Sequence, residues 1–134
     1  MNPQRKIFSL EQANALVPQL ESLLGELEVK FDAFRKLQDE LFFMELLEGM
    51  SPPEERLQEI ETTLTVLEHE IENIHGLGCT LRHVERGLVD FLARRQEEWF
   101  YYCWRRGEKA VRFYHSLRGG FLERQPLTEK QSTI

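Results

Sequence analysis

The sequence predicts an α+β protein in which a long antiparallel helical hairpin is followed by a small antiparallel β-sheet. In the first half, apolar residues recur in steps of three and four, as on one face of a helix. After Gly76 the chain breaks into short segments rich in aromatic and β-branched residues, separated by polar stretches that contain glycine. The length fits one domain. We expect that domain over residues 1–127, with the hairpin at about 9–75, the β-rich part at about 77–122 and a flexible tail at 128–134.

The first helix is predicted to begin after Ser9, whose hydroxyl can cap the first turn. Gln12 completes a capping box, and Phe8 with Ala13 can form a hydrophobic staple. Pro18 predicts a kink or a short separate turn, because proline removes a backbone donor from the helix. The apolar face then continues through Leu20, Leu24, Leu27, Phe31, Phe34, Leu37, Leu41 and Met44.

The second helix is predicted to begin at Ser51-Pro52-Pro53-Glu54, with the serine as its cap. Gly76 is expected to end it in the left-handed conformation. Between them lies a coiled-coil seam formed by Leu57, Ile60, Leu64, Leu67, Ile71 and Ile74. Each helix of the hairpin has mainly one apolar stripe, which a second copy or the C-terminal part of the chain must cover. We therefore expect a homodimer.

The second half predicts three or four strands within Cys79–Val84, Leu88–Ala93, Trp99–Trp104 and Ala110–His115. A hairpin turn is expected around Gly107, where glycine can adopt positive φ. A turn centred there pairs Cys103 with about Val111 or Arg112. The alternative is that Lys109–Leu117 forms a helical turn instead of a strand.

Hydropathy and cysteine content limit the function classes. No apolar run approaches the roughly 20 residues that a membrane span needs. The N-terminal segment MNPQRKIFSLEQ lacks the apolar core of a signal peptide. We therefore expect a cytoplasmic protein without membrane contact, in which Cys79 and Cys103 are thiols.

The charge is distributed unevenly. Residues 1–75 have a balance of −10 and residues 76–134 one of +4, within a total of −6. Nine of the basic residues in the second half are arginines, which suit bidentate contacts to carboxylate or phosphate. This pattern fits an acidic ligand, or an acidic half docking on a basic half within one chain or between two. Arginines among aromatic residues can also stack nucleic-acid bases, but the overall acidity argues against high-affinity nucleic-acid binding.

Rare residue types crowd into Gly87–Leu127, which contains both Trp and all three Tyr. Asp90 alternates onto the same strand face as Leu88 and Leu92. A carboxylate there needs a partner, and we expect Arg112 or Arg124. The candidate ligand-binding residues are Asp90, Trp104, Glu108, Arg112, His115 and Arg124.

Cys103, Glu108 and His115 are of the types that ligate zinc, with Asp90 as a possible fourth ligand. Their spacing matches no established zinc signature, and the expected register separates Cys103 from His115. We therefore predict no cofactor, with a divalent metal such as zinc as the alternative.

Recurring motif positions lie along nearly the whole chain. They are Phe8, Ala13, Asn14 and Pro18; Gly87, Val89, Asp90 and Phe91; Cys103, Trp104, Gly107 and Glu108; Tyr114 and His115; and Gly120, Arg124 and Pro126. In their order and spacing they resemble a family of small bacterial proteins known as domain of unknown function family 2203. Tyr114 stands where that family more often has Trp. The resemblance implies a bacterial, cytosolic, single-domain protein and implies no activity.

The function predicted from these patterns is a non-enzymatic binding or protein-interaction module, with a ligand site in residues 87–126 and an acidic small-molecule or protein partner. The alternative is a metal-dependent or carboxylate-based enzyme centred on Asp90, Cys103, Glu108 and His115.

Overall fold

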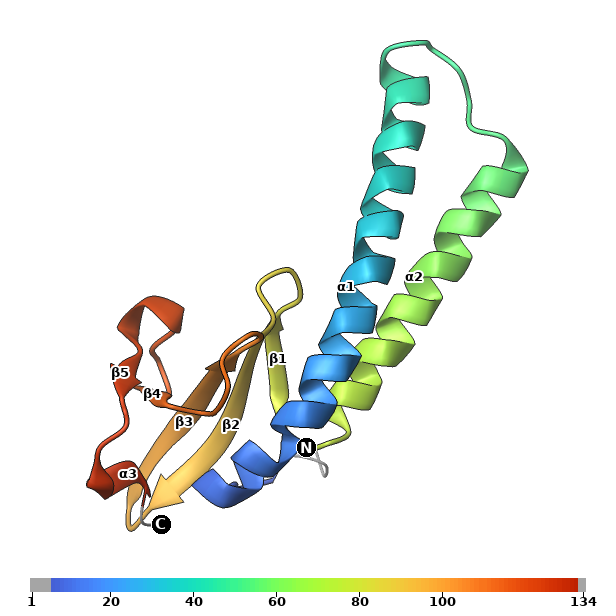
Figure 1. Ribbon diagram of the computed structural model, residues 1–134. Helices are drawn as coiled ribbons and strands as arrows, with labels where there is room; N and C mark the ends of the chain where they lie inside the picture. The colour runs from blue at the N-terminus through green and yellow to red at the C-terminus, as the bar shows by residue number, and fades with distance from the viewer. Residues whose placement is uncertain (1–5, 133–134) are drawn as a thin grey trace.

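The helical hairpin and the antiparallel sheet predicted from the sequence are both present (Figure 1). The computed structural model describes residues 6–132. Helices α1 and α2 form the hairpin, and the sheet packs beside its lower half, so that the distal half projects into solvent. The elements are α1 (Leu10–Leu46), α2 (Glu54–His75), β1 (Thr80–His83), β2 (Leu88–Arg95), β3 (Glu98–Arg105), β4 (Phe113–Ser116), the 3-10 helix η1 (Phe121–Glu123), β5 (Gln125–Pro126) and α3 (Glu129–Ser132).

The start of α1 confirms the predicted capping box. Ser9 Oγ accepts a hydrogen bond from the Gln12 backbone N–H at 3.1 Å, and Gln12 Oε1 accepts one from the Ser9 N–H at 3.0 Å. The helix runs without interruption through Pro18, and its first turns lie at an angle to the remainder (Figure 1). Proline bends the helix here without ending it.

The predicted cap of α2 at Ser51 was wrong by two residues, whereas its predicted end at Gly76 is confirmed and only the left-handed conformation of that glycine was wrong. The cap residue is Pro53, with no side-chain hydrogen bond, so Ser51 does not cap the helix. Gly76 has φ −62° and is right-handed, whereas Gly78 adopts the left-handed conformation at φ +98°. The chain makes one further turn after α2 before it reverses, because the N–H groups of Leu77 and Gly78 still bond to carbonyls of the last helical turn.

The sheet has five strands instead of the predicted three or four, in the order β1-β2-β3-β4-β5, and each adjacent pair is antiparallel. The additional strand, β5, is two residues long and contains a proline, so its sequence has no strand pattern. The alternative of a helical turn over Lys109–Leu117 is excluded, since β4 lies within this segment. Gly107 has φ +101°, as its predicted turn position requires.

The two faces of the sheet have different surroundings. Phe100, Tyr102 and Trp104 point from β3 into the core that the sheet shares with the helices. Alternation therefore places Tyr101 and Cys103 on the opposite face, which we call the open face. Candidate groups on that face can reach a ligand without disturbing the helical core.

The segment that we expected to be a flexible tail contains α3, whose Gln131 is buried. The Tyr102 hydroxyl donates a 2.5 Å hydrogen bond to the Gln131 carbonyl oxygen. This contact ties the end of the described chain to the helical side of the sheet. The flexibility of residues 128–134 stays a prediction.

Candidate functional site

Three candidate residues from adjacent strands meet on the open face. Asp90 of β2 lies directly opposite Cys103 of β3. Cys103 in turn pairs with Phe113 of β4, which places His115 one diagonal step away on the same face. All three residues are buried, with at most 3% of their surface exposed.

The predicted pairing of Cys103 with Val111 or Arg112 was wrong. The chain does not return in a tight turn at Gly107, and β4 begins at Phe113. The longer connection shifts the register and brings Cys103 close to His115. The register expected from the sequence would have kept Cys103 and His115 apart. Because that register was wrong, the two residues can belong to one site.

Asp90 is paired, but with neither of the expected arginines. Its Oδ2 accepts a 2.9 Å hydrogen bond from Arg82 Nε, and its Oδ1 lies 3.0 Å from His115 Nε2. Thr80 pairs with Asp90 across the strands, so alternation along β1 sets Arg82 on the open face. Arg82 is the site residue that the sequence analysis missed. Its signal was the Thr-Leu-Arg alternation of β1.

His115 is held as an imidazolium by its hydrogen-bond partners. Nδ1 lies 2.7 Å from the Ser116 carbonyl oxygen, which can only accept, and Nε2 faces the Asp90 carboxylate. Both ring nitrogens therefore donate. Burial opposes the charged form, but the hydrogen bonds to Asp90, Cys103 and Ser116 outweigh burial and raise the pKa of His115 to about 10.

Arg124 and Glu108 form a second pair beside this cluster. Arg124 Nη2 lies 2.6 Å from Glu108 Oε2 and Nη1 lies 3.3 Å from Oε1. The guanidinium stacks against the Phe113 and Phe121 rings, at 4.0 and 4.6 Å from their centroids. Its Nη1 also lies 4.0 Å from Cys103 Sγ. Glu108 is thus committed to Arg124 and is not brought into the Asp90 cluster.

A cavity of about 210 Å³ opens above the cluster. Its roof comes from the segment between β4 and η1, and its floor from the strands. It is lined by Arg82, Leu88, Asp90, Cys103, His115, Leu117, Gly119, Gly120 and Phe121. With His115 protonated, the charged groups of this lining carry one net positive charge.

Four predicted ligand-binding residues do not line the cavity, namely Trp104, Arg112 and the paired Glu108 and Arg124. Trp104 is fully buried on the helical side, where its Nε1 donates a 2.9 Å hydrogen bond to the Glu108 carbonyl oxygen. Arg112 is exposed in the connection before β4. The structure thus brings together Asp90, Cys103 and His115, with Arg124 at their edge.

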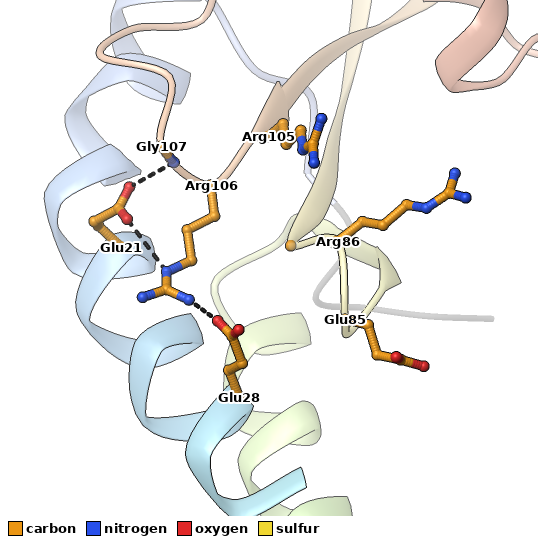
Figure 2. A pocket seen from close by; sticks show the side chains of 8 residues that line it. Glu21, Glu28, Glu85, Arg86, Arg105, Arg106 and Gly107 are labelled. Atoms are coloured by element: carbon orange, nitrogen blue, oxygen red, sulfur yellow. Dashed lines mark hydrogen bonds and ion pairs between the residues drawn. The ribbon is translucent and has the colours of Figure 1, made fainter. Parts of the chain in front are cut away.

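A second cavity, of about 290 Å³, lies between α1 and the β3–β4 connection (Figure 2). Arg106 reaches across it to form ion pairs with Glu21 and Glu28 of α1, and the Gly107 N–H donates to Glu21 at 3.2 Å. These ion pairs fasten the sheet to the helix, and the three glutamates of the lining are balanced by its three arginines. We therefore assign this cavity a structural role and place the candidate site on the open face.

Comparison with known proteins defines the family. A family model described as an uncharacterized conserved protein (DUF2203) matches residues 6–127, so the chain belongs to this family. No curated protein and no solved structure gives a significant match. Within residues 6–132, no helix combines the length and apolar character that a membrane crossing requires.

Proposed function

We propose that this protein is a binding module that takes a small organic or inorganic anion into the open-face cavity. The observation that carries the proposal is the cationic floor of the cavity, where Arg82 and His115 outweigh the single carboxylate of Asp90. Opposite charge on a ligand would balance this excess positive charge. The cavity volume is below the roughly 300–1,000 Å³ typical of sites for drug-sized ligands, which favours a small carboxylate or phosphate.

Arg82 is the group that would contact the anion. Its Nε–H is used by Asp90, which orients the guanidinium. The side chain remains 44% exposed and lines the cavity, with its guanidinium 4.9 Å from the centroid of the Tyr101 ring, so a ligand in the cavity would meet Arg82. A guanidinium binds carboxylate or phosphate through two parallel hydrogen bonds. His115 and Asp90 would then act mainly by holding Arg82 in place.

Thermal denaturation in a panel of small anions tests this proposal. Malonate or phosphate, compared with chloride at equal ionic strength, should raise the melting temperature by several degrees, because ligand at about 100 times its Kd adds about 2.7 kcal/mol. Arg82→Gln should remove the effect. Arg112→Gln, which removes an exposed arginine outside the cavity, should retain it. The proposal is contradicted if the anions stabilise both variants equally. It is also contradicted if they do not stabilise the parent protein.

We further propose that the module acts as a homodimer through the distal hairpin. The distal part of the described hairpin, residues 37–64, which we call the tip, exposes a group of large apolar side chains, namely Phe42, Phe43, Leu46, Leu47, Met50, Leu57 and Leu64. Residues 37–64 contain eight acidic residues and one arginine. Packing two such tips together would bring like charges together, whereas the basic half of a second copy offers the opposite charge. We therefore propose that the acidic, apolar tip of one copy binds the basic sheet half of the other.

Sedimentation equilibrium at increasing salt tests this assembly. A dimer held by the acidic tip and a basic sheet should dissociate as salt screens the charges, and Phe43→Asp should abolish it. Val29→Asp changes another exposed apolar residue of α1 away from the tip and should leave the dimer intact. A protein that stays monomeric, or a dimer that salt strengthens, contradicts this arrangement.

A further inference from the structure

The ligand atoms of Asp90, Cys103 and His115 all lie within 4.8 Å of one another, and each side chain is buried. A carboxylate oxygen, a thiol sulfur and an imidazole nitrogen are the donor types that bind Zn²⁺ together. They come from three hydrogen-bonded strands, so a rigid sheet fixes their relative positions. The cluster also faces a cavity, which leaves room for a further ligand.

The surrounding hydrogen bonds orient the side chains of His115 and Asp90, so that one potential ligand atom of each points into the cluster. His115 Nδ1 bonds to the Ser116 carbonyl oxygen at 2.7 Å, which fixes the ring and directs Nε2 towards Asp90. Arg82 holds Asp90 Oδ2 at 2.9 Å, so that Oδ1 is the oxygen facing His115. Metal-binding histidines commonly donate their other N–H to a backbone carbonyl, and ligating carboxylates are themselves hydrogen-bonded. The cluster has both features.

We propose that Asp90, Cys103 and His115 form a binding site for one Zn²⁺ ion or a similar divalent transition metal. On binding, His115 gives up its Nε2 proton and Cys103 its thiol proton. Two protons leave as one divalent cation enters, so the charge of the cavity floor is unchanged. The metal site therefore does not depend on the proposed anion binding, and neither excludes the other.

The geometry needs a small adjustment to hold the ion. Bond lengths of about 2.0 Å to nitrogen or oxygen and 2.3 Å to sulfur place tetrahedral ligand atoms roughly 3.3–3.7 Å apart. Asp90 Oδ1 and His115 Nε2 are already 3.0 Å apart. Because all three ligand atoms lie within 4.8 Å of one another, Cys103 Sγ would have to move by no more than roughly 1 Å to reach the tetrahedral spacing. Three protein ligands leave a fourth position for water or an anion from the cavity, as in zinc sites that remain open to substrate.

Glu108, which the sequence suggested as a ligand, is not part of this site. Both of its carboxylate oxygens bond to Arg124, and Oε1 also accepts from the Arg105 N–H at 2.7 Å. Asp90 supplies the carboxylate in its place.

Cobalt substitution tests the proposal directly. Metal-free protein titrated with Co²⁺ should develop thiolate-to-cobalt charge-transfer absorption that saturates at one ion per chain, and Zn²⁺ should displace the cobalt. Cys103→Ala should lose the absorption and weaken Zn²⁺ binding by at least about 100-fold. Cys79→Ala provides the matched control, because Cys79 is also a buried free thiol but lies in the helical core. This variant should behave like the parent protein.

A parent protein that shows no saturable thiolate–cobalt absorption overturns the proposal. The same holds for absorption that persists in Cys103→Ala. Should Cys103→Ala fail to fold, alkylation of the parent protein replaces it, and Zn²⁺ should slow modification of Cys103 but not of Cys79. Equal rates with and without Zn²⁺ also overturn the site. The anion experiments use metal-free protein, so either proposal can fail without the other.

Discussion

Replacing Asp90 with Asn is expected to destabilise the metal-free protein strongly. The substitution preserves the shape of the side chain but leaves His115 and Arg82 without their anionic partner, and both Asp90 and His115 are 3% exposed. Removing one member of a buried ion pair costs about 3–5 kcal/mol. The pKa of His115, which burial lowers but hydrogen bonds to Asp90, Cys103 and Ser116 raise to about 10, points in the same direction.

Guanidinium denaturation measures this loss. With a denaturant slope of about 2–6 kcal/mol per molar, the midpoint of Asp90→Asn should fall by about 1 M. Asp32→Asn makes the same chemical change at an exposed position of α1 and should change stability by less than about 0.5 kcal/mol. A loss below about 1 kcal/mol for Asp90→Asn would refute the buried ion pair as a source of stability.

The pH dependence of the same metal-free protein follows from the raised pKa of His115. A pKa above the unfolded value means that the folded state binds the proton more tightly. The stabilisation is therefore complete below pH 6.5 and is lost progressively as the pH rises through about 10. NMR should show an imidazolium at pH 8 in the parent protein. In Asp90→Asn the effect of burial on the His115 pKa should dominate, so the imidazole ring should be neutral at pH 8. A parent protein in which His115 titrates near 6.5 would contradict this account.

Two further stability predictions concern backbone space and arginine geometry. Gly87→Ala should lower the free energy of unfolding by about 1–3 kcal/mol more than Gly49→Ala does. Both glycines have φ near +60°, but only at Gly87 would the added Cβ lie 2.6 Å from Arg106 Cβ. Equal losses in chemical denaturation would discount that contact. Arg124→Lys should cost about 1.5–3 kcal/mol, since lysine cannot make the paired contacts to Glu108. A change within experimental error would show that this pair contributes little.

The sequence predicts most of the fold because its signals are local. The capping box at Ser9 and the apolar periodicity of α1 concern residues within a few turns of each other, and both are confirmed. The cap at Ser51 and the left-handed conformation at Gly76 were wrong because serine and glycine are the residue types that most often take these positions. Which neighbouring residue takes that position depends on how the chain enters and leaves the sheet.

The site was predicted less completely, because its geometry depends on register. Alternation marked Asp90 as a carboxylate that needs a partner, and residue type marked Cys103 and His115. The choice of Arg82 as the partner depends on β1 pairing with β2. The approach of Cys103 to His115 depends on the length of the β3–β4 connection. Neither relation is contained in a local pattern.

The most direct test of the central claim is an NMR titration of ¹⁵N-labelled, metal-free protein with malonate. Binding in the open-face cavity predicts saturable shifts of the Gly119, Gly120 and Cys103 amides, which lie around the cavity, and predicts their loss in Arg82→Gln. Shifts centred on Gly87 and Arg106 would place the anion in the other cavity. That result, or the absence of saturable shifts, would contradict the account.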